Sequence, residues 1–213
     1  MSSPLFDTLF RPTVAPVAPP AVPPTGAPSA PSAPPERVRG TRTRAGNAMD
    51  RTRAALLAGA ARAVEVSGTR ITMAQVAAAA GVAKATLYNH FRTREAVLDA
   101  LVVDQTRVIA AGCAGERLAD TLVDAATLIS THPVRAALAR LEPATLAALG
   151  RVDGTAAAWQ LARAAVDDQL AAAGLAGTDT VLRWLASFLV TPGDQRAIAA
   201  DVAVLLAGLP PRV

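Results

Sequence analysis

Apolar residues recur with a helical period from residue 49 onward. Leu56, Leu57, Ala60 and Val64 lie three or four positions apart and, with their neighbours, predict one helix over residues 49–66. Gly68 follows this segment and suits a left-handed helix cap. The C-terminal part shows no alternation typical of strands, so the pattern predicts an all-α protein.

Two short helices with a glycine turn between them are predicted next. Thr72, followed three residues later by Gln75, forms a capping box that starts a helix ending near Ala80. Gly81 stands where a tight turn needs a positive φ, and a second short helix runs to about His90. Two such helices make a helix-turn-helix, whose second helix enters the major groove of DNA.

One face of the second short helix is predicted to contact DNA. Leu87 and Phe91 are spaced i, i+4 and should face the core, which leaves the polar and small positions of this helix for DNA. These positions are Lys84, Ala85, Thr86, Tyr88, Asn89 and His90. A lysine can bind a guanine edge or a phosphate, small residues allow close approach, and the longer polar side chains can donate to phosphates.

Further helices are predicted along the remainder of the chain. They cover residues 95–111, 116–130, 133–141, 143–149, 155–173, 179–190 and 194–207. Pro133 and Pro143 lie near predicted starts, Thr155 and Thr178 are predicted caps, and glycines follow several ends. We therefore expect a helix-turn-helix domain over residues 46–94 and a second helical domain over residues 95–213.

The first 45 residues are predicted to form a tail. Eleven of the sixteen prolines fall within residues 1–35, where repeated proline prevents a helix and favours a disordered or polyproline II chain. Residues 3–10 could form one helical turn with an apolar face, either as a docking peptide or as an incidental N-terminus.

The formal net charge of +4 is the sum of unlike segments. Residues 36–94 carry eleven basic and three acidic residues, a net of +8, whereas residues 95–213 carry nine basic and thirteen acidic residues, a net of −4. A basic segment before an acidic one indicates a polyanion partner, although a solvated charged surface would look the same. Arg37, Arg39, Arg42 and Arg44 could form an arm that enters the minor groove of double-stranded DNA, or belong to a mobile linker.

The composition argues against several other classes. The single cysteine cannot form an intrachain disulfide, which suits a cytoplasmic location, and two histidines with one cysteine are too few for a typical zinc site. No long uncharged apolar run predicts a membrane helix. An acyl-transfer enzyme would need a nucleophile, a base and an orienting group, for which the sequence offers no motif. We expect no cofactor, no catalytic residue and no metal.

Residues 49–103 resemble the DNA-binding domain of the TetR family of bacterial transcriptional regulators. The resemblance rests on Ala54-Ala55, Ala60-Ala61, Gly68, Thr72, Val76-Ala77, Ala80-Gly81-Val82, Thr86-Leu87-Tyr88, His90-Phe91, Arg94-Glu95 and Leu98. It implies DNA contacts by Thr72, Lys84, Thr86, Tyr88 and His90, with Arg94 reaching a phosphate. Ala83 departs from the usual Ser or Thr, so the recognition helix loses a side-chain cap; Ala85 stands where glycine is common.

The resemblance also implies a homodimer and a small-molecule effector. The last two helices, through residues such as Val181, Leu185 and Ile198, would pair with those of a second copy, unless they only fill the chain's own core. We expect a repressor released from a palindromic operator by an apolar effector. Candidate pocket residues are Cys113, Leu128, His132 and Trp159, with Arg135, Leu138 and Leu146 beside them. The alternative is a DNA-binding regulator without an effector, controlled by a protein partner through the N-terminal tail.

Overall fold

The computed structural model describes residues 41–113 and 117–212, and these residues are almost entirely helical. In chain order the elements are α2 (Thr41–Ser67), η1 (Gly68–Arg70, a 3-10 turn), α3 (Met73–Ala80), α4 (Lys84–His90), α5 (Arg94–Gly112), α6 (Leu118–Thr131), α7 (Pro133–Leu141), α8 (Pro143–Leu149), α9 (Ala157–Ala172), α10 (Thr178–Val190) and α11 (Gln195–Ala207). Over the same ranges Leu175 and Pro211 form an isolated β-bridge and no strand forms. The predicted all-α class is confirmed.

The first helix is longer than the sequence pattern predicted. α2 begins at Thr41 rather than near residue 49, because the segment between them contains no proline and includes arginine and alanine, which favour helix. Arg42 and Arg44 therefore lie on a helix and not in an extended arm, which corrects the last five residues of the predicted tail. The rest of that tail, with residues 3–10, Arg37 and Arg39, lies outside the described residues.

The other helix boundaries agree with prediction to within a residue or two, but two caps differ. α9 begins at Ala157, and Thr155 does not cap it, because its N–H and hydroxyl donate to Asp153 Oδ1 at 2.8 and 2.7 Å. α10 begins with Thr178 itself, whose hydroxyl donates to Asp167 Oδ1 at 2.8 Å. Both threonines thus bond to an aspartate instead of to a helix end.

Two hydrophobic clusters fill the interior. The first joins α2, α3 and α4 to the start of α5 and to α7 and α8; its members include Leu56, Leu87, Val97, Leu138 and Leu146. The second joins α6, α9, α10 and α11 around buried leucine, valine, isoleucine and phenylalanine residues. Because the first cluster includes residues on both sides of residue 94, the helix-turn-helix and the following helices share packing.

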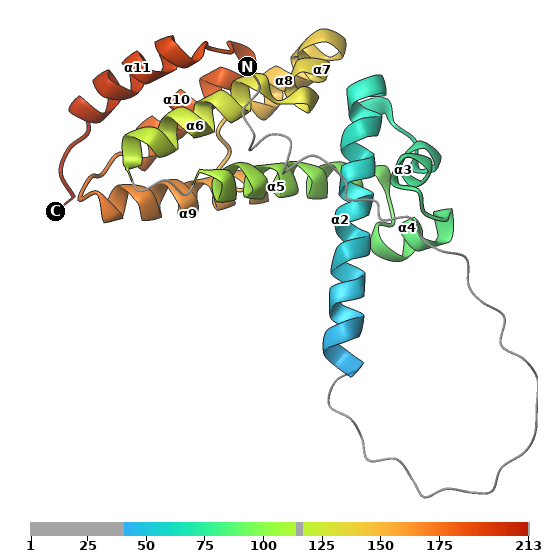
Figure 1. Cartoon of the computed structure of the whole chain (residues 1–213). Coiled ribbons are helices and arrows are strands. Elements are labelled where there is room, and N and C mark those ends of the chain that lie inside the picture. Colours follow the sequence, from blue (N-terminus) through green and yellow to red (C-terminus); the bar gives the residue numbers. More distant parts are fainter. Residues whose placement is uncertain (1–40, 114–116, 213) are drawn as a thin grey trace, which may run out of the picture. The chain divides into compact units, whose positions relative to one another are not determined.

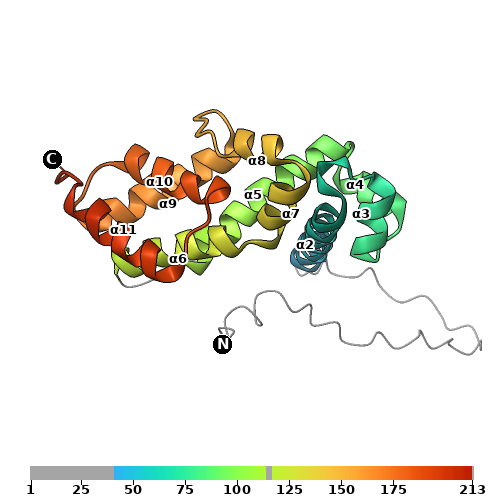
Figure 2. The ribbon, with the colours of Figure 1, turned by 90° about the horizontal axis from the view of Figure 1, so that it is seen from above.

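The helices are arranged around α2 and α5. Figures 1 and 2 both show α3 and α4 on one side of α2, with α5 leading away from α2 toward α9. α2 packs against α3, α5 and α7, while α6 packs against α10 and α11. None of the described helices is both long enough and apolar enough to cross a membrane.

Candidate DNA-binding surface and internal cavity

The first helix of the helix-turn-helix is closed at both ends by its own sequence. The Thr72 hydroxyl accepts the N–H of Gln75 at 3.2 Å, and the Gln75 amide oxygen accepts the N–H of Thr72 at 2.7 Å, which completes the predicted capping box. Gly81 follows α3 with φ +70°. This left-handed conformation favours glycine and lets the chain turn into α4.

α3 lies unusually close to α2. A Cβ added to Gly59 of α2 would come within 2.6 Å of the Cβ and backbone nitrogen of Ala80. Arg62, one turn further along α2, donates to the carbonyl of Ala79. The absent side chain at Gly59 therefore allows the close contact between α2 and α3. We call the segment from α2 to α4, residues 41–90, the DNA-binding head.

The recognition helix α4 is fixed from its buried side. Leu87 is completely buried and Phe91, directly after the helix, is 4% exposed. Arg53 of α2 places its guanidinium carbon 4.6 Å from the centre of the Phe91 ring. Ala83 occupies the N-cap position with no side-chain hydrogen bond, as predicted. Packing, and not capping, holds α4 in place.

The opposite side of α4 is open to solvent. Lys84 and Tyr88, and likewise Ala85 and Asn89, are spaced i, i+4, and all four are exposed. Thr86 and His90 are half-buried and lie toward the edges of this surface. We call these six residues the recognition face. Their assignment as DNA contacts stays a prediction.

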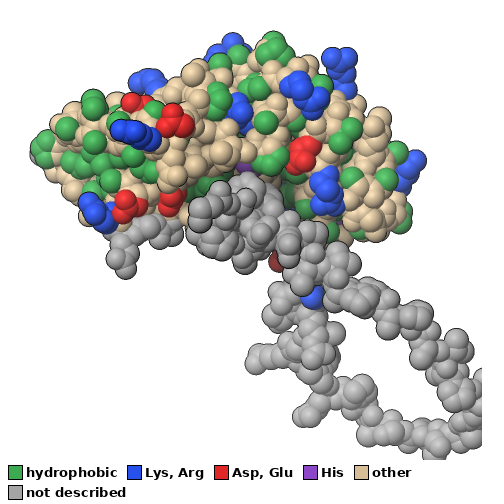
Figure 3. All heavy atoms as spheres, turned by 45° about the horizontal axis from the view of Figure 1, so that its top comes forward, with side chains coloured by type: hydrophobic (Ala, Val, Ile, Leu, Met, Phe, Trp, Pro, Cys, Tyr) green, Lys and Arg blue, Asp and Glu red, His purple; other side chains and the backbone are tan. Residues whose placement is uncertain are grey.

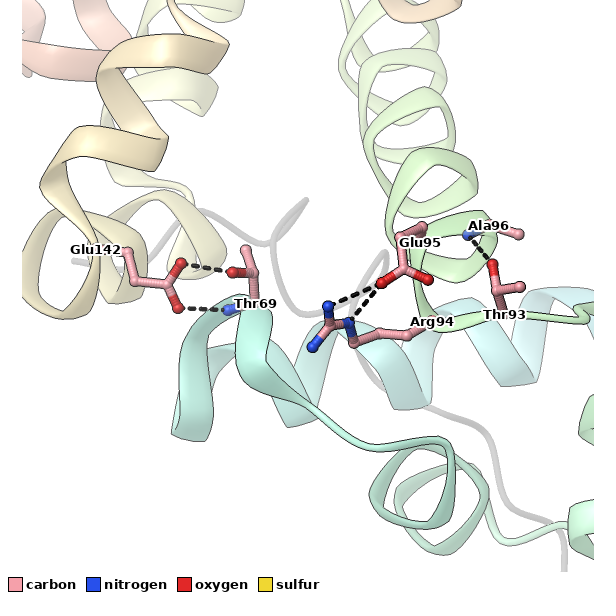
Figure 4. Close-up of polar contacts among 6 residues, drawn as sticks. All are labelled: Thr69, Thr93, Arg94, Glu95, Ala96 and Glu142. Atoms are coloured by element: carbon pink, nitrogen blue, oxygen red, sulfur yellow. Dashed lines mark hydrogen bonds and ion pairs between the residues drawn. The ribbon is translucent and has the colours of Figure 1, made fainter.

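Two further predicted DNA contacts, Thr72 and Arg94, already bond to other residues of the chain. The Thr72 hydroxyl also donates to the Gln75 amide oxygen at 2.9 Å, so its proton is already used. Arg94 donates to Glu95 through Nε at 3.1 Å and Nη2 at 2.8 Å (Figure 4). The Arg94–Glu95 pair is exposed, and exposed ion pairs are weak, so Arg94 can exchange partners. On the face drawn in Figure 3, acidic and basic side chains are interspersed.

A large cavity lies among α5 to α10. Its volume is about 900 Å³, within the range of small-molecule sites. Leu101, Leu138 and Leu146 line it and also belong to the first hydrophobic cluster, whereas Leu122 and Leu185 line it and belong to the second. The cavity therefore lies between the two clusters and shares residues with both.

Most of the predicted pocket residues line this cavity. They are Cys113, His132 and Trp159, with Arg135, Leu138 and Leu146. Leu128 is not among the lining residues; it packs against the second cluster and faces Gly112 of α5. Leu128 is therefore a half-buried residue at the margin of the second cluster and not part of the cavity wall.

The polar lining residues are perturbed by burial. Burial raises the pKa of the Cys113 thiol to about 12, with a smaller contribution from Asp124, so this cysteine stays protonated. Burial also lowers the pKa of His132, and the neighbouring Arg135 lowers it further. His132 Nε2 lies 2.8 Å from Gln105 Oε1. Gln105 was not predicted from sequence, although a glutamine among Val102, Val103 and Ile109 could have indicated an inward polar group.

A second unpredicted residue joins the DNA-binding head to the cavity helices. Glu142, between α7 and α8, accepts the N–H and the hydroxyl of Thr69 at 2.8 and 2.5 Å (Figure 4). It also accepts the hydroxyl of Thr145 at 3.2 Å. These hydrogen bonds, led by the Thr69 hydroxyl, lower the pKa of Glu142. Gly68 has φ +65°, and any Cβ there would collide with the carboxylate. No local sequence signal could have paired residues so far apart.

The helices α3 and α4 form a helix-turn-helix, and the helices that follow surround a partly open cavity. A helix-turn-helix is typical of DNA-binding proteins. Residues 56–101 match the model of the bacterial regulatory proteins of the tetR family. Residues 56–101 are therefore similar to the DNA-binding domain of this family, as the sequence resemblance implied.

Several solved structures have the same fold. The TetR-family repressor AlkX from Dietzia sp. strain DQ12-45-1b, implicated in n-alkane biodegradation, is 18% identical with a TM-score of 0.52, over 73% of this chain and 93% of that one. GusR from Salmonella enterica is 18% identical with a TM-score of 0.53, over 74% and 94%. A third, described as the molecular basis for control of antibiotic production by bacterial hormones, is 21% identical with a TM-score of 0.51, over 75% and 97%. No curated protein matches the chain.

Proposed function

We propose that this protein is a homodimeric repressor that binds a palindromic operator and leaves it when a small effector enters the cavity. The observation that carries the proposal is the cavity of about 900 Å³, whose lining includes Val64 and Leu101 of the first hydrophobic cluster, the cluster that also contains the buried residues of α3 and α4. A ligand that alters their packing would alter the position of the recognition face. Repressor AlkX, which has the same fold, supports repression as the direction of control.

The recognition face would enter the major groove. Lys84 is the only lysine of the chain, exposed at the first turn of α4, and Tyr88 lies one turn further on the same side. Selection of bound sequences from a random DNA pool would give the operator and its symmetry. A selected DNA sequence that contains no inverted repeat would contradict the dimer.

The Lys84→Ala variant distinguishes two roles for the lysine. If Lys84 binds a guanine edge, affinity falls by about 1–3 kcal/mol and discrimination is lost at one base pair. If it binds a phosphate, all sequences weaken together and the salt dependence becomes shallower. Arg107→Ala, an exposed change on α5, is the matched control and should leave binding unchanged. Equal affinity of Lys84→Ala and the unaltered protein would exclude Lys84 as a DNA contact.

The dimer would form through the outer face of α11. The predicted residues Val181, Leu185 and Ile198 are buried inside the chain itself, so they fill its own core. The exposed side of α11 carries Val204, which is 76% exposed, together with several alanines. Small apolar side chains allow close approach of helices, and two-fold symmetry would place two recognition helices on one operator.

A thermal-shift screen with apolar compounds tests the effector site. A compound that binds the folded state raises the midpoint of unfolding. Because coupling is reciprocal, a true effector must weaken operator binding by the same factor by which the operator weakens effector binding. A compound that binds without any effect on operator affinity would not be an effector, and a consistent absence of coupling would favour control by a protein partner.

A further inference from the structure

The wall of the cavity is mostly apolar, and three of its polar residues lie on α5, on α7 and at the start of α7. Gln105 of α5, His132 between α6 and α7, and Arg135 of α7 all line it. We call these three residues the polar corner. Around them the lining is dominated by leucine, isoleucine, valine and alanine. We take the cavity to be the effector site, so the assignment of its ligand rests on the proposed function.

Arg135 carries a positive charge without a matching negative one. The guanidinium is half-buried, its Nε is enclosed with no hydrogen-bond partner, and its Nη1 reaches only the carbonyl of Leu189 at 3.4 Å. Among the described residues, Arg135 takes part in none of the ion pairs found. Arginine side chains removed from water are normally paired with an acidic group. Arg135 has no such acidic partner among the described residues.

The rest of the polar corner adds no negative charge. His132 donates from Nε2 to the amide oxygen of Gln105 at 2.8 Å, since such an oxygen can only accept. Burial and the nearby Arg135 hold the pKa of His132 below its ordinary value, so its ring is neutral at physiological pH. The three residues of the corner therefore carry one net positive charge. The nearby carboxylate of Asp104 accepts a hydrogen bond from Gln105 Nε2 at 3.3 Å, but it does not line the cavity and is paired with Arg107 at 3.8 Å.

The acidic residues of the lining lie elsewhere. Asp99, Asp153 and Asp168 are all exposed to solvent, and exposed carboxylates are hydrated. They attract a cation far less than a half-buried guanidinium attracts an anion, because water screens them. Inside the cavity, the charged group that lacks a partner is therefore the guanidinium of Arg135, which a negatively charged ligand group would pair.

We infer that the cavity binds an amphipathic carboxylate, with its carboxyl group against Arg135 and its hydrocarbon chain along the apolar wall. Arginine binds a carboxylate through two parallel hydrogen bonds, which fixes the head group. The cavity volume of about 900 Å³ lies near the upper end for small-molecule sites, so it suits an extended chain. This makes the expected apolar effector more specific, because a purely apolar ligand would leave Arg135 unpaired.

Calorimetric titration of the full-length protein with dodecanoate and with dodecanol tests the inference. The two probes share a hydrocarbon chain and differ in the head group. We expect dodecanoate to bind more tightly, and Arg135→Gln to weaken dodecanoate roughly tenfold to hundredfold while leaving dodecanol unchanged. Arg107→Gln removes the same charge from an exposed, non-lining position of α5 and should change neither affinity. Circular dichroism would establish that each variant is folded.

Three results would overturn the inference. They are equal binding of acid and alcohol, retention of dodecanoate affinity by folded Arg135→Gln, and tighter binding of dodecylamine than of dodecanoate. Each leaves the proposed function intact if one of the compounds still releases the operator. Failure of the proposed function has a different signature: dodecanoate would bind through Arg135 and yet leave operator affinity unchanged.

Discussion

Single residues set how closely the parts of the DNA-binding head approach. Gly59 is the clearest case, because it occupies the interior of α2, where glycine is ordinarily unfavourable, yet any side chain there would meet the backbone of Ala80. Backbone atoms cannot move aside as the end of a flexible side chain can. Glycine is thus required at position 59 by the neighbouring backbone of Ala80 and not by the helix to which it belongs.

Gly59→Ala should destabilise the protein although alanine is the better helix former. The gain in helix propensity is about 1 kcal/mol, whereas overpacking typically costs about 1–3 kcal/mol and here involves backbone. Gly112→Ala is the matched control, since its Cβ would meet only Leu128 Cδ1 at 3.6 Å. Urea unfolding would measure both. Equal stability of the two variants would contradict the close contact between α2 and α3.

At the scale of elements, α4 and the joint between α7 and α8 contrast in how they are held. α4 has only seven residues and an uncapped start, so the buried Leu87 must hold it against the core. The joint contains a charged residue, Glu142, whose side-chain hydrogen bonds reach across to Thr69 of η1. One element relies on burial, and the other on hydrogen bonds to a partner far along the chain.

Ala83→Ser should stabilise α4. Ala83 has φ −67° and ψ 146°, the extended conformation in which a serine hydroxyl accepts a helix N–H. The expected gain is about 1 kcal/mol in the free energy of unfolding. Ala85→Ser, an exposed change inside the same helix, is the control and should be neutral or slightly destabilising. Thermal unfolding would compare them, and a lower midpoint for Ala83→Ser would show that the cap geometry is not available.

Glu142→Gln should destabilise the protein at neutral pH, by about 1–3 kcal/mol, because a Thr69 donor loses its acceptor. The pKa of Glu142 in the folded state lies below its ordinary value of 4.5, so the carboxylate stabilises the fold above that pH. The stabilisation is lost as the pH falls through the lowered value, and the gap between protein and variant should close. Urea titrations across this range would measure it, with exposed Asp120→Asn as control. A gap independent of pH would exclude the carboxylate charge as the cause.

For the whole molecule, the cavity lies where two cores meet. Residues 41–113 and 117–212 belong to one compact unit, and the cavity shares lining residues with both hydrophobic clusters. A ligand there would repack the core that supports α4 as well as the core formed by α6, α9, α10 and α11. Binding at the cavity and at DNA can therefore be coupled without direct contact between the two sites.

Val204→Arg should convert the proposed dimer to a monomer. A buried charge without a partner at a two-fold interface appears twice and is strongly unfavourable. Ala171→Arg, on an exposed position of α9, should leave the dimer intact. Sedimentation equilibrium would give the mass, and operator affinity should fall as the dimer is lost. A dimer that persists in Val204→Arg would place the interface elsewhere.

The sequence alone determined the local structure. The helical periods, the capping box at Thr72 and Gln75, and the turn at Gly81 each depend on residues within a few positions of one another, so the pattern was sufficient. The composition likewise separated a basic segment from an acidic one. The i, i+4 spacing of Leu87 and Phe91 correctly predicted the buried side of α4, and so which of its residues are exposed.

Only the tertiary structure decided which distant residues meet. It placed Glu142 against Thr69, moved Val181 and Leu185 from the expected interface into the chain's own core, and left Arg135 on a cavity wall without an acid. Periodicity identifies the apolar side of a helix but not the helix that covers it. Contacts between residues far apart in sequence depend on how whole helices pack, and no local pattern carries that information.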